Sequence, residues 1–262
     1  MFMSISYIIA DCLNESNGLT VLRKQIQEGT SDRFTLGFTD PPFNINLPKN
    51  VNAGKTFQST RIKQNLNQSY YNDIFHEEEQ YNDIEYKQWC KTWFQYLYDI
   101  CDIVIIYCGN INKFMWYSIE PPLDEFIYYT PFNYIITPIS WVGRYKPLLV
   151  YTHDKNLFLG RNGTYKLHTN VIVKPRTEII QKNYQKKLNP YCHPCPLDEY
   201  LVYRVLRELK PKSVIDPFLG SGTILSACKQ LHIPCCGFEK NPIYESDIKK
   251  RLRQQNLQFL LK

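Results

Sequence analysis

The 262-residue chain lacks the features that mark membrane and secreted proteins. No run of about 18 consecutive apolar residues occurs, which is the length that a membrane-spanning helix needs. The first ten residues carry neither the basic segment nor the small-residue cleavage site of a secretory signal. We therefore expect a soluble, intracellular protein without a membrane partner, in either the cytoplasm or the nucleus.

The cysteines do not suggest a disulfide framework or a metal centre. Nine is an odd number, and they are scattered through expected strands and helices, which favours reduced thiols acting as small core residues. Cys192 and Cys195 have the spacing of half a zinc site, but no suitable second pair follows and the five histidines do not cluster. We therefore expect no bound metal.

Length and composition are compatible with a single α/β domain. A chain with 44% apolar residues can bury a sizeable core, and a second full domain would not fit easily, so residues 1–262 are predicted to form one domain. The net charge of +6 suits a polyanionic partner without establishing one.

The most informative motif is Asp40-Pro41-Pro42-Phe43, which directly follows an apolar run at residues 34–39. The run predicts a strand whose end delivers the motif to the sheet edge where open α/β folds bind ligands. Asp40 and the Pro41 carbonyl can accept protons from an amino group, and Phe43 offers a face for a planar ring. The prolines restrict the backbone. Taken alone, an ordinary proline turn explains the motif equally well.

A second motif, from Ser213 to Thr223, predicts a short strand, a tight turn and a helix. Gly220 and Gly222 permit positive φ and leave no Cβ to block a ligand. The helix that begins near Thr223 offers free N–H groups at its N-terminus. No Lys follows Gly222, so the turn lacks the G-K-[ST] sequence that holds a triphosphate.

A further short strand is predicted at Ile233–Glu239, and it ends on an acid. Glu239 follows Asp216 by 239 − 216 = 23 positions. This is close to the ~20-residue offset at which an acidic side chain binds a ribose hydroxyl in nucleotide-binding βαβ units. Strand, turn, helix, strand and terminal acid therefore agree on a nucleotide-binding unit.

Together the two motifs resemble those of S-adenosylmethionine-dependent DNA amino-methyltransferases. In the permuted beta group of that family, a D-P-P-[YF] block precedes a D-P-F-x-G-S-G-T block, and both are present here in that order. The resemblance implies a Rossmann-like methyltransferase fold with a mostly parallel sheet, an antiparallel hairpin and helices on both faces. It also implies S-adenosyl-L-methionine as cofactor and DNA as substrate.

The resemblance further implies which residues act. Asp40, Pro41, Pro42 and Phe43 match the catalytic block. Two other segments match with departures from the family pattern, because Ala10 replaces a usual Gly and no Lys-Pro pair follows the His-Pro block. The implied cofactor-binding residues are Asp11 and Cys12 near the adenine, His193 near the methionine end, Glu239 on the ribose, and Asp216, Phe218, Gly220, Ser221, Gly222, Thr223 and Asn241.

The region between the two blocks predicts further elements. Residues 85–100 have helical apolar spacing, and residues 103–107 predict a buried strand. Strands at 135–142 and 148–152 are expected to form a hairpin through a turn at Gly143–Pro147. The candidate nucleic-acid contacts combine rings and positive charge at this turn and in the next basic stretch, and they are Arg144, Tyr145, Lys146, Lys174 and Arg176.

Two polar intervals have little apolar periodicity. Residues 44–83 predict a long mobile loop that could close over a base. Residues 154–189 are the space left for target recognition, which is small for reading several base pairs. We therefore expect short or relaxed sequence specificity, or help from a partner subunit or a second copy of the chain. A solvated lysine-rich loop is the simpler alternative for this interval.

The expected reaction is direct in-line methyl transfer to a flipped-out base. Adenine N6 is the first choice of acceptor, because an initial Asp is commoner in the family for adenine and an initial Ser for cytosine. Cytosine N4 offers a similar amine and is the main alternative. An RNA base remains open, since no reader of the 2′-OH is evident. A catalytically silent nucleic-acid-binding subunit is a further alternative.

Overall fold

The computed structural model describes residues 4–44, 81–130, 145–157, 170–174, 191–193 and 196–253. The strands in these ranges are β1 (Ile5–Ile9), β2 (Phe34–Thr39), β3 (Cys101–Tyr107), β4 (Asp124–Tyr129), β5 (Tyr145–Thr152), β6 (Val171–Val173), β7 (Val214–Asp216) and β8 (Cys235–Glu239). The α-helices are α1 (Leu19–Gln27), α4 (Asp83–Ile100), α5 (Lys113–Ile119), α6 (Glu199–Leu209), α7 (Thr223–Gln230) and α8 (Glu245–Arg253). Short 3-10 turns are η2 (Asn110–Asn112), η3 (Lys155–Leu157) and η5 (Pro242–Tyr244).

The strands form one sheet in the order β1-β8-β7-β2-β3-β5-β4-β6. Neighbours from β1 to β3 are parallel, whereas β5 is antiparallel to both β3 and β4. From the central β2–β7 pair, the chain continues outward to β3 on one side and to β8 on the other. This reversal of strand order opens a crevice at the carboxyl ends of β2 and β7, where ligands bind in such sheets.

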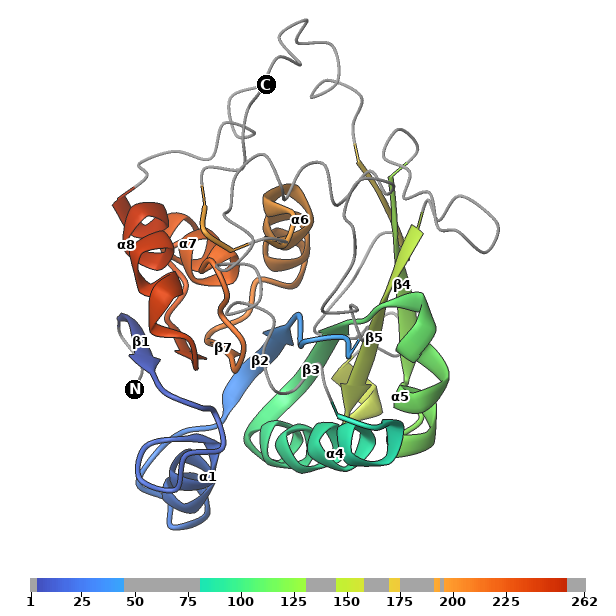
Figure 1. Ribbon diagram of the computed structural model, residues 1–262, viewed down its shortest axis with the longest axis horizontal. Helices are drawn as coiled ribbons and strands as arrows, with labels where there is room; N and C mark the ends of the chain where they lie inside the picture. The colour runs from blue at the N-terminus through green and yellow to red at the C-terminus, as the bar shows by residue number, and fades with distance from the viewer. Residues whose placement is uncertain are drawn as a thin grey trace, which may run out of the picture.

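Helices cover both faces of the sheet (Figure 1), so the expected mostly parallel Rossmann-like fold is confirmed. Strand β3 shows how one sequence serves both layers. Ile103 and Ile105 pack in the core with α6 and α7, while Val104 and Ile106 pack in the core with α1 and α4. This alternation follows from the two-residue period of a strand, and burial on both faces explains why the strand is apolar throughout.

Helix α4 begins two residues before the predicted start at residue 85, because its first turn is capped. The Asn82 side chain accepts hydrogen bonds from the Ile84 and Glu85 N–H groups, and the Glu85 carboxylate accepts one from the Asn82 N–H. Such a capping box satisfies N–H groups that have no partner within the helix. The C-terminal end of the loop predicted at 44–83 is therefore a helix cap, and its residues 45–80 lie outside the described ranges.

The predicted turn at Gly143–Pro147 is wrong over its last three residues, because β5 already begins at Tyr145. Pro147 fits within the strand because its carbonyl faces the end of β3 and accepts a hydrogen bond from Cys108 N–H. In an antiparallel pair, the N–H and carbonyl of one residue point toward the same neighbouring strand. The N–H that Pro147 lacks would therefore also point toward β3, beyond the last paired residue of that strand, where no ladder hydrogen bond is lost. The strand predicted at 135–142 lies outside the described residues. In the described part, β5 pairs instead with β4.

Strands β4 and β6 were not anticipated from the sequence. β4 starts with two acids and buries only alternate side chains, Phe126 and Tyr128, so it lacks the continuous apolar run that identified β2 and β3. β6 has three residues, which is too short for a periodic pattern, and it lies within the interval predicted for target recognition.

None of the described helices is both long enough and apolar enough to cross a bilayer. Within the same ranges, no three His, Cys, Asp or Glu side chains come together in a way that could hold a metal ion. The described cysteines are free thiols, and most of them are buried. Cys195, one half of the C-x-x-C pair, is not among the described residues.

Candidate active site

The two proline-containing blocks meet in space at the centre of the sheet. Strands β2 and β7 are adjacent, with Leu36 opposite Val214. At their carboxyl ends, the Thr39 hydroxyl donates a hydrogen bond of 2.8 Å to the Asp216 carboxylate, and both side chains are buried. Asp40 directly follows Thr39, and Asp216 leads into the glycine turn. This hydrogen bond therefore holds Asp40 close to the turn, although the two blocks lie about 180 positions apart in the chain.

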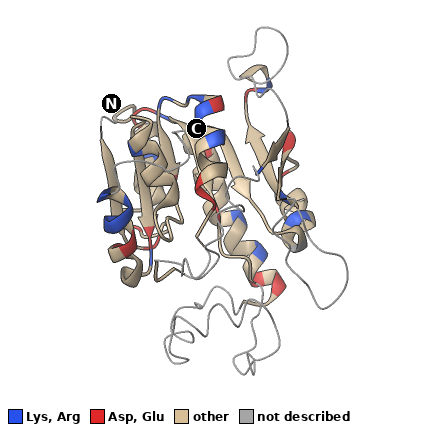
Figure 2. Ribbon diagram, turned by 90° about the horizontal axis from the view of Figure 1, so that it is seen from above, with Lys and Arg blue, Asp and Glu red and all other residues tan. Residues whose placement is uncertain are grey.

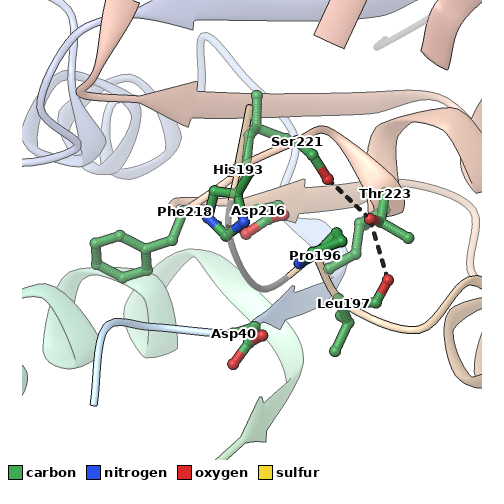
Figure 3. Close-up of a pocket in the computed structure, with 11 residues that line it drawn as sticks. Asp40, His193, Pro196, Leu197, Asp216, Phe218, Ser221 and Thr223 are labelled. Carbon is green, nitrogen blue, oxygen red and sulfur yellow. Dashed lines mark hydrogen bonds between the residues drawn. The ribbon is translucent and has the colours of Figure 1, made fainter. Parts of the chain in front are cut away.

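A pocket with about 310 Å³ of empty space, partly open to solvent, lies at this junction. In Figure 3, Asp40 lies on one side of the pocket with Asp216 and His193 opposite it, Phe218 lies at one end, and Pro196, Leu197 and Thr223 lie toward the other. The pocket therefore collects residues from both blocks and from the His-Pro segment. Its lining consists of Asp40, His193, Pro196, Leu197, Asp216, Phe218, Leu219, Gly220, Ser221, Thr223 and Ile224.

The turn after β7 needs its glycines. Gly220 has φ +51° and Gly222 has φ +79°, a region that other residues rarely adopt. A Cβ on Gly220 would lie 2.8 Å from His193 Nε2, so the close approach of that ring to the turn also requires glycine. Gly222 precedes helix α7, whose first N–H groups are directed toward the turn. The two glycines thus leave room for close approach to the turn next to a helix N-terminus.

Glu239 organises the same turn from the end of β8. Its carboxylate accepts hydrogen bonds of 2.7 Å from the Gly220 N–H and from the Asn241 N–H. An ionised carboxylate has about four acceptor positions, so a side chain of this kind can accept a ligand hydroxyl in addition to backbone N–H groups. Asp11 lies after β1, the neighbour of β8, where it accepts from Leu13 N–H and pairs with Lys240 at 3.5 Å.

Not every residue assigned to the cofactor reaches the pocket. The Cys12 side chain is buried in the apolar core beside α1 and α4. The Cys12 carbonyl accepts a hydrogen bond from the N–H of Leu19, the first residue of α1, so this segment fixes the N-terminal end of that helix. Glu239 binds the turn, Asn241 binds Glu239, and Asp11 pairs with Lys240, but none of these three acids and amides lines the pocket of Figure 3. His193 does line it, with its ring centroid 4.7 Å from that of Tyr244.

The backbone of the catalytic block is fixed from two directions. The Tyr86 hydroxyl on α4 donates to the Pro42 carbonyl, and the Asn112 amide donates to the Phe43 carbonyl at 2.6 Å. Among the described residues, no donor binds the carbonyl of Pro41, the residue directly after Asp40. The two acceptors predicted for an amino group therefore adjoin each other on a backbone with little freedom.

An aromatic and cationic cluster lies beside this block. The Phe43 ring centroid is 6.4 Å from that of Tyr107, at the end of β3, with an interplanar angle of 33°. Lys146 Nζ lies 5.2 Å from the Tyr107 ring centroid, within the range of a cation–π contact. Tyr107 is buried and supports the partly exposed Phe43 ring, which can stack a planar base, and the ammonium can attract the negative phosphate of that base or a ring acceptor.

The two pocket carboxyls are unusually hard to ionise. Burial raises the pKa of Asp40 to about 8, helped by the nearby Asp216 and opposed by the positive charge of Lys146. Burial raises the pKa of Asp216 to about 7, although hydrogen bonds from Phe218 N–H and the Thr39 hydroxyl lower it. The Asp40 side chain keeps partial contact with solvent through the pocket. A cation placed between these acids would favour their ionised forms.

The predicted nucleic-acid contacts have different environments. Tyr145 is exposed, and Lys146 lies in the cluster beside Phe43. Lys174 instead forms an ion pair of 2.6 Å with Asp198, the residue that caps α6, which gives Lys174 a structural contact. Arg144 and Arg176 lie outside the described residues. Over the described part of the chain, basic and acidic residues are interspersed and do not gather on one side (Figure 2).

Sequence reasoning missed several residues that build the site. Thr39 could have been noticed as the polar last residue of β2, directly before Asp40, but Tyr86 and Asn112 are 44 and 69 positions from the carbonyls they bind. Trp89 and Trp93 pack against the Phe218 ring with centroid distances of 5.5 and 4.9 Å. They fix one wall of the pocket, and their helical spacing alone indicated only a core face.

The geometry fits S-adenosyl-L-methionine. A glycine-containing turn at a helix N-terminus can take the amino-acid end, Glu239 can accept a ribose hydroxyl, and the buried Asp216 carboxyl can balance a sulfonium charge. Asp40 and Phe43 lie next to this pocket and can present an amine to it.

Comparisons with known structures agree with this assignment of the fold. The chain is similar to M1.HpyAVI in its complex with S-adenosylmethionine, with a TM-score of 0.57 and 18% identity over 96% of this chain and 100% of that one. TTHA0409 from Thermus thermophilus, also complexed with S-adenosyl-L-methionine, has a TM-score of 0.56 and 13% identity over 98% and 96%. The cytosine-N4-specific PvuII DNA methyltransferase has a TM-score of 0.55 and 15% identity over 86% and 82%.

Among curated proteins, no sequence matches the chain. A family model described as DNA methylase matches residues 34–250, a range that includes both blocks and most of the chain. The chain therefore belongs to the S-adenosylmethionine-dependent DNA methylases that modify adenine N6 or cytosine N4.

Proposed function

We propose that this protein methylates the exocyclic N6 of adenine in DNA, by direct transfer from S-adenosyl-L-methionine to a flipped-out base. The observation that carries the proposal is the 2.8 Å hydrogen bond from Thr39 to Asp216. It joins the Asp40 block to the glycine turn, so that a methyl donor in the pocket and an amine on Asp40 would be neighbours. Neighbours of this fold that carry S-adenosylmethionine support the same use of the pocket.

In this proposal the chain's main task is positioning. The base leaves the duplex at a cost of a few kcal/mol and stacks on the partly exposed Phe43 ring. Its amino group donates to the Asp40 carboxylate and to the Pro41 carbonyl, which directs the nitrogen lone pair toward the pocket that Asp40 lines. S-adenosyl-L-methionine supplies an electrophilic methyl group on a sulfonium. After transfer the extra proton leaves the nitrogen toward Asp40, whose raised pKa makes it a suitable acceptor near neutral pH.

The choice of base rests on the first residue of the block. An initial Asp is commoner among adenine-specific relatives, which favours adenine N6. Cytosine N4 is the second candidate, because a cytosine amine can make the same two hydrogen bonds to Asp40 and the Pro41 carbonyl. The cytosine-N4-specific neighbour shows that the same fold is compatible with that acceptor.

Nucleoside mass spectrometry after incubation with unmethylated DNA and cofactor labelled in its methyl group tests the proposal. We expect label in N6-methyladenine. Label in N4-methylcytosine would identify cytosine as the accepting base and leave the proposed mechanism unchanged. Label found only with an RNA substrate would identify RNA as the substrate in place of DNA. No label in any base, together with no saturable cofactor binding in calorimetry, would instead identify a silent nucleic-acid-binding subunit.

A further inference from the structure

Helix α8 carries a pair of buried charged residues, one turn apart. Arg251 is 2% exposed and Asp247 is 3% exposed, although both lie on a helix that is otherwise rich in exposed Lys and Arg. Buried charges are costly unless they are paired and hydrogen-bonded. The contacts of these two residues therefore indicate what the arrangement accomplishes.

Arg251 contacts three separate segments around the pocket. Its Nε donates a hydrogen bond of 3.1 Å to the Ser221 hydroxyl in the glycine turn. Its guanidinium pairs with the Glu199 carboxylate in the first turn of α6, and the guanidinium carbon lies 3.9 Å from the centroid of the Tyr191 ring. The planar guanidinium can make the ion pair, the Nε bond and the ring contact at the same time.

Asp247 fixes the His193 segment, which forms another wall of the pocket. Its carboxylate accepts a hydrogen bond of 2.9 Å from the His193 N–H, and the His193 ring is the group that rests against Gly220. Residues 191 and 193 are thus tied to α8 through both buried charges. On the pocket side, Ser221 lies 3.4 Å from the Thr223 hydroxyl, which in turn donates to the Leu197 carbonyl at 3.3 Å.

We propose that Arg251 and Asp247 are positioning residues that hold the glycine turn, the His193 segment and the start of α6 in register, and so set cofactor affinity without touching the cofactor. Neither residue lines the pocket. Each acts through residues that do, chiefly Ser221 and His193. The inference rests on the proposed use of this pocket for S-adenosyl-L-methionine.

The test compares variants that differ in how they disturb the pair. Arg251→Lys keeps the charge for Glu199 but lacks the Nε donor and the planar face. The double variant Arg251→Met/Glu199→Gln removes both partners, so that no acid is left without its cation. Asp247→Ala removes the bond to His193. Lys249→Met is the matched control, because Lys249 is exposed on the same helix and forms a surface ion pair of 2.9 Å with Glu245, one turn away.

Binding of S-adenosyl-L-methionine by calorimetry and turnover at saturating cofactor are measured for each variant. We expect the dissociation constant to rise about tenfold or more in Arg251→Lys, in the double variant and in Asp247→Ala, with kcat at saturation within about twofold of wild type. The Lys249→Met control should match wild type in both. A role confined to folding would lower the melting temperature without this split between affinity and kcat.

Wild-type cofactor affinity in Arg251→Lys and in the double variant would overturn the inference, as would a loss confined to kcat. Arg251→Lys preserves the ion pair, so it gives a result even if the double variant does not fold. Failure of the proposed function is recognised separately, because the wild-type protein itself would then show no saturable heat with S-adenosyl-L-methionine.

Discussion

Replacing Asp40 by Asn should stabilise the unliganded protein while removing the carboxylate that we propose as acceptor for the amino group of the base. The pKa of Asp40 is raised to about 8, mainly by burial. Between the ordinary pKa of the unfolded chain and that value, the folded state holds a proton that the unfolded state has released. The contribution of Asp40 to stability therefore falls as pH rises from about 4 to 8. An amide at this position does not ionise, so its contribution does not fall.

The magnitude follows from the size of the change in pKa. The shift from 3.8 to about 8 would correspond to roughly 6 kcal/mol in a water-free site, at about 1.36 kcal/mol for each pKa unit. Asp40 keeps partial contact with solvent, which screens the charge, so we expect about a third of this, ~2 kcal/mol, above pH 8. For a chain of this size that is about 4–8 °C in melting temperature.

Thermal or denaturant unfolding of the two proteins from pH 5 to pH 9 gives the answer. The advantage of Asp40→Asn should be small at pH 5 and should grow through pH 8. The matched control is Asp124→Asn, since the Asp124 side chain is exposed at the start of β4, and its effect should be small throughout. A difference that is independent of pH, or an Asp40→Asn protein less stable than wild type at pH 9, would refute the reasoning.

Three further substitutions test the pocket. Gly220→Ala should raise the cofactor dissociation constant at least about tenfold, because the added Cβ would lie 2.8 Å from His193. The control Gly29→Ala has similar backbone strain, with φ +71°, but its Cβ would enter open space, so the affinity should not change. Equal cofactor affinities in the two variants would contradict this. Thr39→Val should lower kcat/KM about tenfold by breaking the 2.8 Å bond to Asp216, and unchanged kinetics would remove that bond from the account. Cofactor affinity should rise with pH through about 7, as the Asp216 carboxylate forms beside a cationic ligand; Asp216→Asn should flatten this dependence in calorimetry, and an equally steep dependence would exclude Asp216 as its origin.

Local sequence patterns were enough to predict the elements that carry both blocks. The run at residues 34–39 is observed as β2, with all six residues buried, because a strand in the middle of a two-faced sheet must be apolar throughout. Helix α7 begins at Thr223 as expected, since the glycines before it permit the turn that starts the helix. Each of these features is encoded within about ten neighbouring residues.

Contacts between distant residues could not be predicted in this way. The bond from Arg251 to Ser221 spans 30 positions and that from Tyr86 to Pro42 spans 44, and neither pair has a local pattern that points to its partner. Cys12 is a second example in which a local sequence pattern does not determine the surroundings of a side chain. Its position beside Asp11 suggested a cofactor contact, but the direction of its side chain is decided by packing against the α1 and α4 core.

The most direct test of the account is methyl transfer by Asp40→Ala, measured together with cofactor binding on the same protein sample. If Asp40 presents the amine to a cofactor held by the glycine turn, transfer of labelled methyl to DNA should fall to background while the cofactor dissociation constant stays within about threefold of wild type. Wild-type turnover in this variant would contradict the account, because the amine would then be held by some other group.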